Sequence, residues 1–184
     1  MKNFYTADLH LGHANIIKYC NRPFDTAEEM NEKLIAGWNS RVKPEDSVFV
    51  LGDFCFRNGP NGKPGEGLQS KSEYYKSRLN GNKIFIRGNH DGNNSLNTNI
   101  LSLVIDFGGS KAYCVHKPEH SNLSYPVVLC GHIHNNWKTA IIKDSLLINV
   151  GVDVHNFRPI SLDELIGMYG KYKAGNLVID RRYK

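Results

Sequence analysis

Short runs of apolar and β-branched residues recur along the chain, and most of them are followed within three residues by an aspartate, asparagine or histidine. The runs cover residues 4–7, 48–51, 84–86, 103–107, 112–115, 127–129, 146–150 and 177–179. Runs of this length, separated by turn-forming residues, are typical of buried β-strands. The sequence therefore predicts a protein built on β-sheets, with polar side chains gathered where the strands end.

A segment between the first two runs has helical spacing. Met30, Leu34 and Trp38 recur at helical intervals within residues 26–40. Strand–helix–strand order predicts a parallel sheet early in the chain, whereas short loops between the later runs predict an antiparallel addition. We therefore expect a mixed α/β fold, with a late helix opened by a capping box of Ser161 and Glu164.

The size and charge of the chain limit its possible domain organisation and partners. A chain of 184 residues falls in the range of one domain, which we expect to span residues 1–184. The apolar runs are far shorter than the roughly 20 residues of a membrane helix. Residues 1–4 lead straight into the first run and leave no room for a cleaved signal peptide, so we expect a soluble cytoplasmic protein. The net charge of +5 favours acidic partners without separating a phosphorylated metabolite from a nucleic acid.

The polar residues that follow the apolar runs are of metal-binding types. They are Asp8, His10, Asp53, Asn89, His90, Asp91, His116, His132 and His134. Open α/β sheets bind ligands at the carboxyl ends of their strands, so these side chains are expected at one edge.

Each of these residues alone has an ordinary structural explanation. An aspartate after a strand often caps a turn or helix, and glycine–asparagine is a common turn dipeptide. The combination favours a different interpretation, because seven of these nine N/O donors would already suffice for two metals and exceed one tetrahedral site. The absence of cysteine from the set favours an open catalytic site over a structural zinc cluster.

The residues occur as Asp8-Leu9-His10, Gly52-Asp53, Gly88-Asn89-His90-Asp91, His116 and Gly131-His132-Ile133-His134. In this order they resemble the five motifs of the calcineurin-like metallophosphoesterases, and they span most of the chain. Residues 11–17 and 149–153 are similar to those of small bacterial and phage-type predicted phosphoesterases. The resemblance implies a four-layer α/β/β/α sandwich with mixed sheets.

The resemblance also implies a metal site for each motif residue. Asp8, His10 and His134 would hold one divalent transition-metal ion, Asn89, His116 and His132 would hold the second, and Asp53 would bridge them. Manganese is preferred, with iron, nickel and zinc as alternatives for imidazole and carboxylate ligands. A hydroxide held by two metals would then attack phosphorus directly.

His90 is not a ligand in the family pattern. We expect it to act as acid on the leaving oxygen, with Asp91 holding its tautomer.

Three residues are candidate contacts to the substrate phosphate: His13, Arg57 and Arg158. His13 is equally suited to capping a helix or supporting a ligand. Guanidinium groups bind phosphate bidentately, but surface solvation is the alternative for each arginine and is preferred for Arg22.

Asp153 is expected to bond a ligand histidine. The turn-rich segment 57–67 is expected to be a surface loop, either a tolerated insertion or a lid.

The predicted activity is metal-dependent hydrolysis of a small phosphorylated or nucleotide-type substrate, with a phosphodiesterase favoured over a phosphatase. One alternative is a nuclease, although a short chain has little with which to build a nucleic-acid groove. Another is a non-catalytic metal-binding scaffold, which would be expected to have lost some ligands. The sequence leaves the oligomeric state open.

Overall fold

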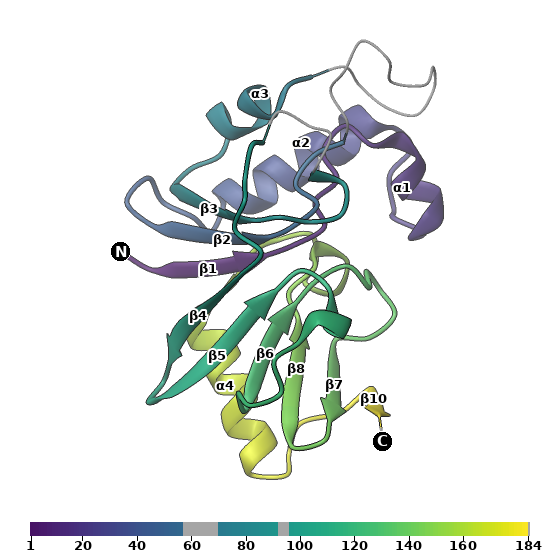
Figure 1. Ribbon diagram of the computed structural model, residues 1–184. Coiled ribbons are helices and arrows are strands. Elements are labelled where there is room, and N and C mark those ends of the chain that lie inside the picture. Colours follow the sequence, from purple (N-terminus) through teal and green to yellow (C-terminus); the bar gives the residue numbers. More distant parts are fainter. Residues whose placement is uncertain (57–69, 92–95, 184) are drawn as a thin grey trace.

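Two mixed β-sheets form the centre of the computed structural model, which describes residues 1–56, 70–91 and 96–183 (Figure 1). The first sheet has the strand order β3-β2-β1-β9. Its strands are β1 (Asn3–Thr6), β2 (Ser47–Leu51), β3 (Asn82–Ile86) and β9 (Ile160–Ser161). β1, β2 and β3 pair in parallel, as the strand–helix–strand pattern predicts, and β9 runs antiparallel to β1.

The second sheet has the strand order β10-β7-β8-β6-β5-β4. Its strands are β4 (Ser102–Phe107), β5 (Ser110–Val115), β6 (Val127–Cys130), β7 (Thr139–Ile142), β8 (Ser145–Asn149) and β10 (Arg181–Tyr183). The hairpins β4–β5 and β7–β8 are antiparallel as predicted, but β6 pairs in parallel with both β5 and β8. The antiparallel prediction is therefore wrong at the sheet centre, where the connection through η2 (Pro118–His120) returns the chain to the start of β6.

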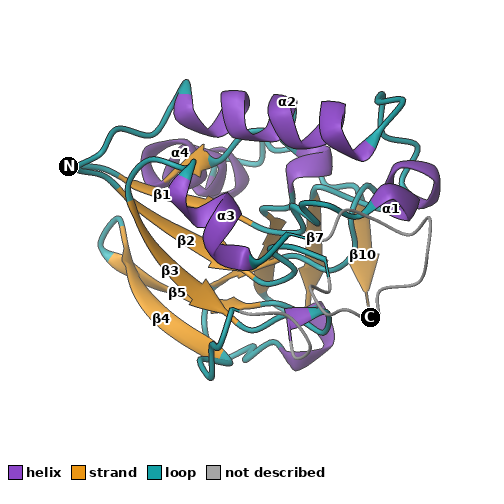
Figure 2. Cartoon of the chain, turned by 90° about the horizontal axis from the view of Figure 1, so that it is seen from above, coloured by secondary structure: helices purple, strands orange, loops and turns teal. Residues whose placement is uncertain are grey.

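Helices α1 (Ala14–Tyr19), α2 (Ala27–Asn39) and α3 (Ser72–Ser77) lie on the side of the first sheet that faces away from the second (Figure 1). Thr26 caps α2 by accepting a hydrogen bond from the Glu29 N–H. The apolar stripe of α2, including Met30 and Trp38, packs against alternate residues of β1 and β2. Figure 2 shows α2 on the β1 side of this sheet, running roughly along its strands.

The remaining inward side chains of β1, β2 and β3 form a second core with β5, β6 and β8. Helix α4 (Leu162–Lys173) begins at the predicted capping box and adds Leu165 to this core. The mixed α/β fold class with two mixed sheets is thus confirmed. Because successive strand residues point to opposite faces, the first sheet contributes side chains to both cores.

Two local predictions differ from the structure. Residues 177–179 are not a strand; the last strand is β10, and Val178 is 79% exposed. Strand β7 and the short helix α3 were not predicted, whereas the helix start expected at His13 is that of α1, although the His13 side chain does not cap it. None of the helices in the described ranges combines the length and the hydropathy needed to span a bilayer.

Candidate metal centre

The candidate ligands lie where strands of both sheets end. Asp8 and His10 follow β1, Asp53 follows β2, and Asn89 follows β3; His116 follows β5, and His132 and His134 follow β6. The parallel pairing of β1 with β2 continues beyond the strands, because the N–H groups of Asp8 and His10 donate to the carbonyls of Gly52 and Asp53 at 3.1 and 3.0 Å. This pairing aligns the first two motifs.

The side chains form two compact groups. Asp8, His10 and His134 make up the first group, and Asp53, His116 and His132 make up the second. Within each group the potential ligand atoms all lie within 4.8 Å of one another. Asn89 joins the second group, since its Oδ1 lies 3.0 Å from the Nε2 of His116. The structure thus brings together all seven residues that the sequence singled out as metal ligands.

Hydrogen bonds fix two of these imidazoles with Nε2 directed into the cluster. The Nδ1 of His116 donates to the Leu51 carbonyl at 2.7 Å, and the Nδ1 of His134 donates to Asp153 at 3.0 Å. Both oxygens of Asp8 accept from the His132 N–H, at 3.1 and 2.8 Å. Partners of this kind orient metal-binding side chains in many proteins.

Burial and close charges set the pKa values of the cluster. Burial raises the pKa of Asp8 to about 6 and lowers the pKa of His10 well below its usual value. Burial also opposes the charged form of His116, but its hydrogen bond to Asp53 and the nearby carboxylates raise its pKa to about 9. Burial opposes ionisation of Asp53 as well, yet the histidines around it hold its pKa below the usual range.

One buried atom lacks a partner that a metal would supply. The Nε2 of His10 has no hydrogen-bond partner among the described residues, and the nearest carboxylate oxygen, Asp53 Oδ2, is 3.5 Å away. Buried polar nitrogens are rarely left unpaired in native proteins. The donor set of imidazole, carboxylate and amide oxygen therefore fits divalent transition-metal ions.

The backbone at the cluster is strained. Asp8, His10, Asp53, His132 and His134 all have positive φ, between 49° and 70°. This conformation costs about 1 kcal/mol or more for a non-glycine residue, and such strain is concentrated at functional sites.

The glycine of the third motif, Gly88, is required by close packing. A Cβ atom on Gly88 would lie only 2.1 Å from Asp53 Oδ1. The third motif can therefore approach Asp53 only because Gly88 has no side chain.

A family model described as calcineurin-like phosphoesterase matches residues 1–161. The chain belongs to the calcineurin-like phosphoesterase family. An uncharacterised protein of Methanocaldococcus jannaschii is 37% identical over 184 residues, which cover 97% of each chain. The gene 66 protein of Mycobacterium phage L5 is 32% identical over 101 residues, covering 55% of this chain and 45% of the phage protein.

A solved structure supports the fold. A protein of unknown function from Aquifex aeolicus superposes with a TM-score of 0.65 at 20% identity, covering 91% of this chain and 98% of that protein. Membership of the phosphoesterase family implies phosphate-ester substrates and divalent metal ions, and the two side-chain groups could hold those ions.

His90 lies beside the cluster of this phosphoesterase and is exposed. Its ring centroid is 5.1 Å from that of His10, and its N–H donates to Asp53 Oδ1 at 2.9 Å. The Asp91 carboxylate, expected to hold the His90 ring, accepts from the N–H groups of Gly88, Asp53 and Phe54 at 2.7, 2.8 and 3.2 Å. These bonds tie the second motif to the third.

The three candidate substrate contacts of this phosphoesterase have different positions. His13 is buried, its Nδ1 lies 3.3 Å from the Nδ1 of His10, and its ring stacks on Phe56 at 4.2 Å. Arg158 is exposed and lines a pocket with Arg41 and Lys138 that contains none of the candidate ligands. The structure does not bring Arg158 to the cluster. Arg57 and the segment 57–67 lie outside the described residues.

Arg22 is the supporting residue that sequence reasoning missed. It was expected to be solvated, but it is only 4% exposed and forms an ion pair with Asp153 at 2.8 Å. Its guanidinium also donates to the carbonyls of Asp8 and Leu9 at 2.6 and 2.9 Å. Asp153 bonds His134 as expected, so Arg22 and Asp153 together connect the first motif to the fifth. No local pattern marks Arg22, because Asp153 is 131 positions away.

Proposed function

We propose that this chain is a two-metal phosphodiesterase acting on a small phosphorylated or nucleotide-type substrate. The position of one oxygen atom carries the proposal. Asp53 Oδ2 lies 3.5 Å from the Nε2 of His10 in the first group and 3.3 Å from the Nε2 of His116 in the second. A carboxylate between two imidazoles from different groups is placed as a bridging ligand would be.

In this proposal, Asp8, His10 and His134 would hold one divalent cation, Asn89, His116 and His132 would hold the other, and Asp53 would be shared. Manganese is the preferred ion, and iron, nickel and zinc are alternatives, because the donors are nitrogen and oxygen atoms without thiolate. When bound, two such cations lower the pKa of water and neutralise charge on the phosphoryl oxygens.

The chain's own residues supply the remaining chemistry. His90 is exposed beside His10, so its imidazole can donate a proton to the leaving oxygen. Asp91 fixes the turn that carries His90 by accepting three backbone hydrogen bonds. His13 supports His10 through the 3.3 Å contact between their Nδ1 atoms, and its place in the pocket with His90 leaves it a candidate contact to substrate.

The test compares bis-p-nitrophenyl phosphate with p-nitrophenyl phosphate as substrates. Purified protein is freed of metal and then reconstituted with Mn²⁺, Ni²⁺, Zn²⁺ or Mg²⁺. We expect hydrolysis only after reconstitution, with a higher kcat/KM for the diester.

Two other outcomes have clear meanings. A higher kcat/KM for the monoester would replace the phosphodiesterase proposal with a phosphatase. Full metal binding without hydrolysis of either compound would contradict catalysis and favour a scaffold.

A further inference from the structure

Two pockets flank the candidate metal centre. The first has a volume of about 330 Å³ and is lined by His10, His13, His90 and His134 among others; we call it the His90 pocket. The second has a volume of about 520 Å³ and includes Asn89 and His116 of the second ligand group; we call it the Tyr113 pocket. Each pocket therefore borders a different ligand group, and 520 Å³ lies in the usual range for small-molecule sites.

The Tyr113 pocket is positively charged. Arg87 and Lys117 line it, as does His120, and none of the described residues of its lining is an aspartate or glutamate. Across the described ranges, neither Arg87 nor Lys117 has a carboxylate within ion-pair distance. In contrast, the described residues that line the His90 pocket include no lysine or arginine. Within the part of the chain that the structure describes, the two sides of the candidate metal centre thus differ in charge.

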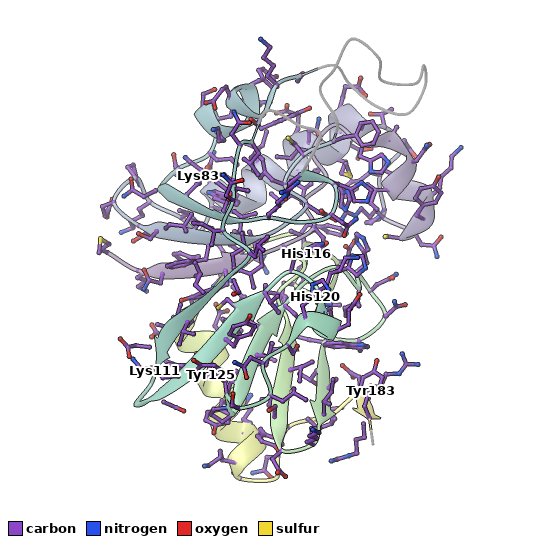
Figure 3. All side chains as sticks on the ribbon, in the orientation of Figure 1. Lys83, Lys111, His116, His120, Tyr125 and Tyr183 are labelled. Atoms are coloured by element: carbon purple, nitrogen blue, oxygen red, sulfur yellow. The ribbon has the colours of Figure 1, made fainter. Side chains whose placement is uncertain are left out.

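Local structure fixes the two cationic residues near the metal centre. Arg87 directly follows β3, and its N–H donates to the Ile100 carbonyl at 2.7 Å, which places it beside Leu101. Lys117 immediately follows His116 and precedes η2. Figure 3 shows His116 and His120 close to the junction of the two sheets. Both cations therefore line the pocket that borders the second ligand group.

The Tyr113 pocket also has an apolar wall. Leu101 is 66% exposed although it is a large hydrophobic residue, and Val115 is buried beneath the surface. The ring of Tyr113 stacks on Tyr125 with centroids 5.7 Å apart and an interplanar angle of 18°. A tyrosine held in this way offers a rigid surface for a planar ring.

We propose that the Tyr113 pocket binds a nucleoside phosphate unit of the substrate, a conclusion that rests on the proposed phosphodiesterase function. The base packs against Tyr113 and Leu101, and Arg87 and Lys117 bind a phosphate other than the one that is cleaved. Arginine and lysine are suited to this second anion. The leaving group lies on the other side, in the His90 pocket.

Three p-nitrophenyl diesters with the same leaving group test the pocket. They are methyl p-nitrophenyl phosphate, thymidine 5′-(p-nitrophenyl phosphate), and the same nucleoside ester with an added 3′-phosphate. With the Mn²⁺-reconstituted protein, we expect kcat/KM to rise in that order. The first step of the series measures the contribution of the nucleoside, and the second measures that of the additional phosphate.

Two variants test which residues cause each of the two increases in kcat/KM. In Tyr113→Leu, the preference for the nucleoside ester over the methyl ester should fall about fivefold or more, because stacking is lost. In Arg87→Gln/Lys117→Gln, the preference for the added phosphate should fall about tenfold or more. Lys111→Gln removes one positive charge from the far end of β5 and should keep the parent ratios (Figure 3).

The possible outcomes distinguish a failure of the pocket proposal from a failure of the proposed phosphodiesterase function. Equal kcat/KM values for the three esters, or ratios unchanged in both variants, would overturn the pocket assignment while leaving a phosphodiesterase. Failure to hydrolyse even the methyl ester with any metal would overturn the proposed function itself. Circular dichroism confirms that each variant is folded before its ratios are compared.

Discussion

The candidate ligand His134 depends on a carboxylate far away in the sequence. Asp153 accepts from its Nδ1 and also pairs with the buried Arg22. The carboxylate therefore keeps the tautomer of His134 in which Nε2 is free for a cation. Removing its charge should weaken the first metal site without removing a ligand.

We predict that Asp153→Asn lowers metal affinity by about 10–100-fold, the usual effect of losing such a partner. Equilibrium titration of metal-free protein with Mn²⁺ measures the change, and excess Mn²⁺ should restore part of the diester hydrolysis. Asp180→Asn is the matched control, since the Asp180 carboxylate accepts from the N–H groups of Lys138 and Thr139 and belongs to neither ligand group. Equal affinities in both variants would contradict this role of Asp153.

His90 is predicted to act after the metals are in place. His90→Ala should lower kcat by about 10²–10⁴-fold on a diester with a poor leaving group, because a general acid contributes that much. The loss should be smaller for p-nitrophenol, which leaves without a proton. Metal content should stay at two ions per chain. If His90→Ala loses both metals, His90 is a ligand or a structural residue rather than an acid.

Residue identity predicted the cluster well because each motif directly follows its strand. The supporting contacts were less predictable. Arg22 and Asp153 meet across 131 positions, and the bonds from Asp91 to the second motif depend on how β2 and β3 pair. Such contacts depend on tertiary folding, so no local spacing reveals them.

At the scale of elements, continuous apolar runs identified the buried strands and helical spacing identified α2. Strand β7 was missed because Thr139–Ile142 is short and follows a polar segment. Helices α1 and α3 have six residues each, too few to show a clear helical period. The two-residue β9 has no strand signal of its own; pairing with β1 defines it.

The capping box of α4 is an element whose contribution can be measured. Ser161 Oγ accepts from the Glu164 N–H, and the Glu164 carboxylate accepts from the Ser161 N–H at 2.9 Å. Ser161→Ala should lower the free energy of unfolding by about 1 kcal/mol. Urea denaturation measures the change. Ser161→Thr keeps the hydroxyl and should retain most of the stability; equal losses in both variants would exclude the cap as the cause.

At the scale of the whole molecule, the candidate metal centre is made of residues that follow strands of both sheets. Asp8, His10, Asp53 and Asn89 follow strands of the first sheet, whereas His116, His132 and His134 follow strands of the second. A cation held by both sets would therefore stabilise the packing of one sheet on the other. Metal binding to the folded chain alone also stabilises it by mass action.

Removal of metal should therefore lower the Tm. At a metal concentration of about 100 times the Kd, stabilisation of about 2.7 kcal/mol is expected. For a chain of this size, that corresponds to a shift of about 5–10 °C. Differential scanning calorimetry with and without a chelator measures it, and Asp53→Asn should reduce the shift. An unchanged Tm would mean that the cluster does not bind metal in the folded chain.

The central claim is that two cations, bridged by Asp53, act together in phosphodiester hydrolysis. Its most direct test is a titration of metal-free protein with Mn²⁺ in which bound metal and bis-p-nitrophenyl phosphate hydrolysis are measured at each step. We predict that the rate rises until two ions are bound per chain and then stays constant. Full activity with a single bound ion, or none with two, would contradict the claim.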